Sequence, residues 1–157
     1  MSEPGTPAIA AADPGANRVI DRAGGRQTGD DPLRSLEQGA AEFNAGLFFE
    51  CHDTLEDAWQ GIRGPARDFF QGLIQVAVGF YHLDNANLKG ARSQLEKGLE
   101  KLARYGDAYL GIELRDFRRE VERWLAGVRA GHVAGGHVRD LPKLRTVTAT
   151  RLSSPPE

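Results

Sequence analysis

The stretch FNAGLFFECHDTLEDAW, residues 43–59, decides the fold because it ends one helical pattern and begins another. After Gly46 the apolar residues recur at the spacing of an α-helix, which predicts a helix over residues 47–62. His52 and Glu56 stand four positions apart within this pattern, so they share one face of the helix. A buried carboxylate needs a cation, a metal or hydrogen-bond donors, and His52 is the simplest partner for Glu56.

The predicted helix has an apolar arc and a solvated face. His52 is expected near the middle of the arc, between aromatic rings. The arc comprises Phe48, Phe49, Cys51, His52, Leu55, Glu56, Ala58, Trp59 and Ile62, and the solvated face comprises Glu50, Asp53, Thr54 and Asp57. Two interpretations stay open. The two polar residues either form a structural pair that fixes the helix register, or line a pocket for a ligand, a metal or a reactant, since histidine beside a carboxylate can exchange protons.

A second helical pattern precedes this stretch. Asp31-Pro32 predicts a helix start, with Asp31 as the N-cap and Pro32 as the first helical residue. Apolar residues then recur at helical spacing as far as Phe43, and Gly46 is suited to a left-handed cap. Because the connection to the next helix is very short, the two helices are expected to form an antiparallel hairpin.

A third helix is predicted from Pro65 to about Leu83, and its wide apolar arc indicates a central, mostly buried helix. Its remaining narrow stripe holds Asp68, Gln71, Gln75 and His82, bordered by Gly72 and Gly79. Either this stripe contacts solvent, or its two glutamines face the His52–Glu56 pair across the hairpin. The glycines favour the second interpretation, because small residues let another backbone come close. His82 is a candidate third member of that group.

Two further helices complete the predicted bundle. The fourth begins at a cap near Asn87 and ends at Gly106, and the fifth covers about residues 113–130. Residues 107–111 between them are expected to form a loop whose Tyr109 and Leu110 pack against the bundle.

The sequence predicts a compact all-α bundle of about five helices, built from antiparallel hairpins and flanked by two tails. Residues 1–31 are rich in Gly, Pro, Ala and Asp without any period, which predicts disorder. The helical domain is expected over residues 32–130 and a mostly irregular tail over residues 131–157. His132 and His137, in the tail, are expected in a mobile loop rather than a metal site. Leu141, Pro142 and Leu144 are candidates to anchor an extended piece on the bundle.

The central residues resemble the small bacterial and archaeal family called domain of unknown function 309. The matching positions are Phe43, Asn44, Gly46, Glu50, His52, Asp53, Leu55, Glu56, Trp59, Gln71, Gly72, Leu73, Ile74 and Gln75. The resemblance covers roughly residues 33–128. It implies a compact all-helical domain, and it implies no activity, because the family is named for lacking one.

Composition and absent motifs exclude several classes of function. The net charge of −2 provides no basic field for nucleic acid or an anionic membrane. The single cysteine, Cys51, excludes an internal disulfide and a cysteine-rich zinc site. No apolar run reaches the roughly 18 residues that a membrane span needs, and a cytoplasmic location is expected. No nucleotide-binding loop, HExxH motif or nucleophile elbow is present, so no cofactor is expected.

The expected function is that of a small binding or interaction module with a polar site between helices. Its candidate residues are His52, Glu56, Trp59, Gln71, Gln75 and His82, and its partner is expected to be a protein or a small molecule. No bound metal is expected, because His52 and Glu56 supply two ligands and only His82 is a further histidine within the bundle. Two alternatives remain: a metal-dependent or acid–base enzyme that uses His52 and Glu56, and a purely structural scaffold.

Overall fold

A computed structural model describes residues 31–133 and 140–147. It contains the α-helices α3 (Pro32–Asn44), α4 (Phe48–Trp59), α5 (Ala66–Asp84), α6 (Leu88–Leu102) and α7 (Arg115–Ala130). The 3-10 turn η2 (Ala103–Tyr105) extends α6, and the short strands β1 (Ala108–Tyr109) and β2 (Ile112–Glu113) precede α7. These helices confirm the predicted all-α class. Residues 1–30, 134–139 and 148–157 lie outside the described residues, and with them most of the segment predicted to be disordered, residues 1–31, and part of the predicted irregular tail, residues 131–157.

The helix boundaries follow the local signals in the sequence. The Asp31 carboxylate accepts a hydrogen bond from the backbone N–H of Leu33 at 3.1 Å, so it caps α3 as predicted. Gly46 takes a left-handed φ of 81° in the turn between α3 and α4. The Asn87 side chain accepts from the backbone N–H of Gly90 at 2.9 Å and caps α6. These three predictions are confirmed.

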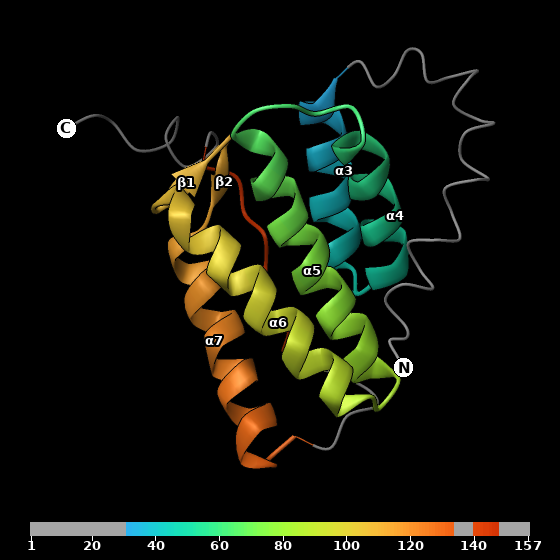
Figure 1. Ribbon diagram of the computed structural model, residues 1–157, viewed down its shortest axis with the longest axis vertical. Helices are drawn as coiled ribbons and strands as arrows, with labels where there is room; N and C mark the ends of the chain where they lie inside the picture. Colours follow the sequence, from blue (N-terminus) through green and yellow to red (C-terminus); the bar gives the residue numbers. More distant parts are fainter. Residues whose placement is uncertain (1–30, 134–139, 148–157) are drawn as a thin grey trace.

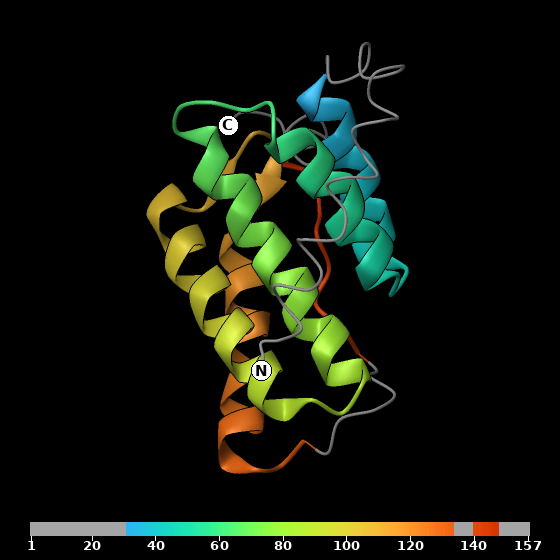
Figure 2. The same cartoon turned by 45° about the vertical axis from the view of Figure 1, so that its right-hand side comes forward.

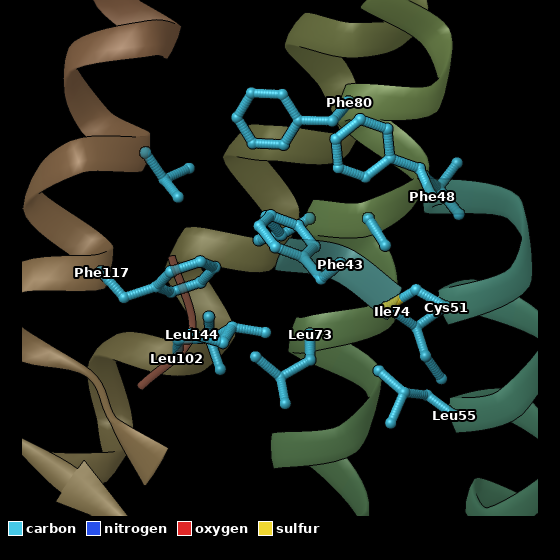
Figure 3. Close-up of a cluster of buried hydrophobic side chains, with 14 of the residues drawn as sticks. Phe43, Phe48, Cys51, Leu55, Leu73, Ile74, Phe80, Leu102, Phe117 and Leu144 are labelled. Carbon is cyan, nitrogen blue, oxygen red and sulfur yellow. The ribbon is translucent and has the colours of Figure 1, made fainter. Parts of the chain in front are cut away.

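Each helix packs against the next one in the chain, with α3 and α4 on one side of α5 and with α6 and α7 on the other (Figure 1). The core runs through the middle of this arrangement, and α5 is buried along most of its length, as predicted. Aromatic rings bring α3 into contact with α7. The ring of Phe43 lies 5.2 Å from that of Phe48, 5.9 Å from Phe80 and 5.5 Å from Phe117 (Figure 3). The two ends of the helix series therefore meet across one core.

Glycines bring α5 and α6 close together. A Cβ atom added at Gly79 would lie 2.6 Å from Cδ2 of Leu95, and one added at Gly98 would lie 2.7 Å from Cγ2 of Val76. Gly72 likewise faces the side chains of Lys101 and Leu102. The expectation that Gly72 and Gly79 let α4 come close was wrong, because both glycines face α6.

The chain between α6 and α7 forms a β-hairpin instead of the predicted loop. Ala108 pairs with Glu113 and Tyr109 with Ile112 in antiparallel register. Leu110 and Gly111 have φ angles of 48° and 81°, as in the two-residue turns that suit a tight hairpin. Tyr109 packs on the core as predicted, but Leu110 is 40% exposed because it occupies the tip of the turn.

An extended segment, residues 141–147, lies on the bundle, and we call it the strap. Leu144 is 4% exposed and belongs to the hydrophobic core. Thr146 forms an isolated β-bridge with Ile112. Figure 2 shows the strap, in red, running lengthwise along the bundle. The predicted anchoring of this segment is confirmed at Leu144, and its backbone is mostly irregular.

Candidate functional site

His52 and Glu56 form the pair that their spacing predicts. Nε2 of His52 lies 3.0 Å from Oε1 of Glu56. The His52 side chain is 6% exposed and the Glu56 side chain is 18% exposed. The histidine is therefore inside the protein, and the carboxylate lies at its margin, where solvent reaches it.

The pair lies at one edge of the buried arc of α4. Cys51 and Leu55 are fully buried and form the centre of that arc, whereas Phe49 is 46% exposed. The expectation that His52 lies mid-arc was therefore wrong, although its ring does lie against that of Phe49, with the two centres 5.8 Å apart. His52 lies at the edge because α4 packs against both α3 and α5, so the most buried side of α4 faces the junction of those two helices.

Two contacts fix how α4 and α5 lie against each other. Near one end, the rings of Phe49 and Tyr81 lie 5.8 Å apart. Near the other end, the guanidinium of Arg67 lies 4.0 Å from the centre of the Trp59 ring and donates to the backbone oxygens of Trp59 and Ile62 at 3.2 and 3.0 Å. The helices are thus antiparallel. Arg67 could not be identified from the sequence, because its contacts depend on the turn between the helices.

This register brings the two predicted glutamines to the level of the pair. His52 and Glu56 lie between the two contacts on α4, and Gln71 and Gln75 lie between them on α5. Both glutamines are half-buried. We call this region the α4–α5 seam, and it comprises Phe49, His52, Glu56, Trp59, Arg67, Gln71, Gln75 and Tyr81.

Three polar atoms of the seam are buried without a hydrogen-bond partner among the described residues. They are Nδ1 of His52, Nε1 of Trp59 and Oε1 of Gln75. If the neutral His52 ring donates from Nε2 to Glu56, its Nδ1 is an acceptor. The unpaired set is then two acceptors and the indole N–H donor. Buried polar atoms without partners are rare and cost stability, so three such atoms among the residues of the seam are unusual.

His82 belongs to a different part of the molecule. Its ring is buried, with Nδ1 3.3 Å from the side-chain nitrogen of Asn87, and it lies beside Gly90 at the start of α6. Burial lowers the pKa of His82. The structure thus groups this histidine with the α5–α6 turn, and no hydrogen bond among the described residues joins it to the His52–Glu56 pair.

Metal-binding and nucleophilic side chains are few near the seam. Within residues 31–133 and 140–147, no group of three or more His, Cys, Asp or Glu side chains is arranged to hold a metal ion. Burial, with the nearby charge of Glu42, raises the pKa of the Cys51 thiol far above its usual range, which keeps it a neutral and poor nucleophile. None of the described helices has the length and apolar character needed to cross a membrane.

The α4–α5 seam lies within the part of the chain that matches a known family. Residues 36–94 match the family described as Domain of unknown function (DUF309). An uncharacterized protein of Aquifex aeolicus (strain VF5) is 24% identical over 98 residues, which are 62% of this chain and 29% of that protein. This chain therefore spans less than a third of that relative. The family match includes α4 and α5 entirely and ends within α6.

Proposed function

We propose that the DUF309 domain, which residues 36–94 of this chain form, is a binding module whose α4–α5 seam holds a small polar ligand. The observation that carries this proposal is that His52, Trp59 and Gln75, all residues of the seam, each have a buried polar atom without a hydrogen-bond partner among the described residues. A structural pair accounts for Nε2 of His52 and for Glu56. It does not account for Nδ1 of His52 or for the indole and amide atoms, which a bound ligand would satisfy.

The unpaired atoms define the chemistry of the ligand. With His52 donating from Nε2 to Glu56, its Nδ1 and Oε1 of Gln75 can accept hydrogen bonds, and Nε1 of Trp59 can donate one. A primary carboxamide has two N–H donors and one carbonyl acceptor, so it complements this set. Arg67 stacks on the Trp59 ring and supports the proposal, because the stacking limits the indole to one orientation.

Acetamide is the simplest probe of this proposal, and the two tryptophans provide an internal control. In ¹⁵N-labelled protein, acetamide should shift the indole N–H resonance of Trp59 with a saturable dependence on concentration. The Trp124 indole lies outside the seam, on α7, and should not respond. Equal shifts at both indoles, or no shift at Trp59, would contradict a specific site.

Glutamine variants test whether the seam makes the contact. Gln75→Leu should abolish the acetamide response, because it removes one acceptor. Gln94→Leu is the matched control, since Gln94 is a buried glutamine on the neighbouring helix α6.

The same spectra address the alternatives. Hydrolysis of acetamide that disappears in His52→Phe would favour an acid–base enzyme, and a seam that binds nothing would favour a structural scaffold.

A further inference from the structure

The strap is held at its middle by one side chain that recognises its backbone. The Asn44 side chain donates from Nδ2 to the carbonyl oxygen of Leu144 at 3.0 Å and accepts from the N–H of Leu144 at 2.7 Å. The ammonium of Lys143 also donates to the backbone oxygen of Asn44 at 3.1 Å. A side-chain amide that pairs both backbone groups of one residue binds extended chain in the way that a neighbouring β-strand does.

The end of the strap adds to the β-hairpin in the same manner. The N–H of Glu113 donates to the carbonyl oxygen of Arg145 at 2.9 Å, and the N–H of Val147 donates to the carbonyl oxygen of Gly111 at 2.7 Å. The strap thereby occupies the free edge of β2 over a short distance, beside the Ile112–Thr146 bridge. Pairing at a sheet edge is a common way for proteins to hold extended peptides.

Few strap side chains enter the protein. Leu144 is 4% exposed, and Pro142 is also buried. Lys143, Arg145 and Thr146 are exposed along the same segment. Leu144 is therefore the main aliphatic anchor of the strap, and Leu141 is half-buried against the core. Leu144 lies near Phe117 and Leu102 in the view of Figure 3.

The surfaces that receive the strap, which are the end of α3 and the edge of β2, are held in place by contacts that do not involve the strap. The end of α3 is fixed by a hydrogen bond from the N–H of Leu47 to the carbonyl oxygen of Glu42. Strand β2 pairs with β1, and the Glu113 carboxylate caps α7 by accepting from the N–H of Asp116 at 3.0 Å. These surfaces thus resemble a preformed receptor more than a structure that the strap assembles.

We propose that Asn44, the edge of β2 and the core around Leu144 form a binding site for an extended peptide with one aliphatic anchor. In this chain residues 141–147 fill the site from within. The anchor pocket and the backbone hydrogen bonds define the ligand, so a segment of the same chemistry on another protein should compete for the site. Because the strap is tethered, its effective concentration is high, and a competing peptide binds well only after the tether is cut.

The test uses the whole chain, with a specific protease sequence replacing residues 134–139, which precede the strap. A fluorescent peptide with the sequence of residues 140–150 is the probe, and its anisotropy reports binding. After cleavage the protein should keep its helical circular dichroism and bind the probe saturably. Before cleavage, binding should be weaker by at least about tenfold, because the tethered strap occupies the site.

Variants of the probe keep the test independent of protein folding. A probe with Leu144→Asp should bind roughly tenfold more weakly or not at all, because it places a charge in the anchor pocket. A probe with Arg145→Ala, altered at an exposed position, is the matched control and should bind like the original. Unfolding upon cleavage, equal binding before and after cleavage, or no effect of Leu144→Asp would each overturn the proposal.

Discussion

At the residue scale, His52 and Glu56 depend on each other, because one hydrogen bond satisfies a polar atom of each. We expect His52→Ala to lower the free energy of unfolding by about 2–4 kcal/mol. Glu56→Ala should cost less, since its side chain is 18% exposed. The losses should not add in the double variant, where coupling of about 0.5–3 kcal/mol is expected between neighbours. Urea denaturation of the four proteins measures this coupling.

The Gln38–Glu42 hydrogen bond provides the matched control for that cycle. It has the same spacing along a helix and a length of 3.0 Å, but it is exposed. Gln38→Ala should therefore cost under about 0.5 kcal/mol, as surface substitutions usually do. A similar loss for His52→Ala would show that the seam does not bury its histidine.

His82 gives a prediction about pH at the same scale. Burial holds its pKa below the ordinary value of 6.5, so near this pH the unfolded chain binds a proton more readily than the folded protein does. Stability should therefore fall as the pH drops below about 6.5. Chemical denaturation at pH values above and below this range should show a smaller fall in His82→Gln than in the parent. An identical pH dependence in both proteins would contradict the effect of burial.

Sequence reasoning identified contacts that depend on spacing along one helix. The His52–Glu56 pair was predictable because residues four apart share a helix face. The exposure of Phe49 and the position of His82 beside Asn87 were not, because neighbouring helices and the turn determine them. The stacking of Arg67 on Trp59 and the three buried atoms without hydrogen-bond partners were also not predictable, because they depend on how the helices pack.

At the element scale, close packing of α5 on α6 depends on glycine. We expect Gly79→Ala to lower the free energy of unfolding by about 1–3 kcal/mol, because the new methyl would lie 2.6 Å from Leu95. Gly61→Ala is the control, since its nearest neighbour is 3.9 Å away and its φ is not positive. Thermal denaturation should separate the two variants, and an equal effect would mean that Leu95 moves aside freely.

The ends of the helices were predictable, and the β-hairpin was not. Asp31, Gly46 and Asn87 act on the backbone within a few residues, so the sequence alone identifies them. Each strand of the hairpin has only two residues, too few for an alternating pattern to appear. Its position instead depends on packing by Tyr109, whose ring lies 4.8 Å from that of Phe69 on α5.

At the scale of the whole molecule, we propose that the two flanking segments contribute unequally to stability. Deleting residues 1–30 should leave the thermal midpoint nearly unchanged, because Asp31 already caps the first described helix. Deleting residues 140–157 should lower stability by about 2–4 kcal/mol, since it removes Leu144 from the core and leaves the Asn44 amide unpaired. Calorimetry of both truncated proteins tests this contrast, which equal losses would refute.

Asn44 and Leu144, which pair through two hydrogen bonds, stand 100 positions apart in the chain. A ribosome releases the chain from its N-terminus, so the helices leave the ribosome before the strap does. Throughout that interval the Asn44 amide faces water, and the aliphatic pocket for Leu144 remains uncovered. Docking of the strap is therefore a late event in the folding of residues 31–147, and a ribosome that stalls before the strap emerges would hold the protein with this surface exposed to chaperones.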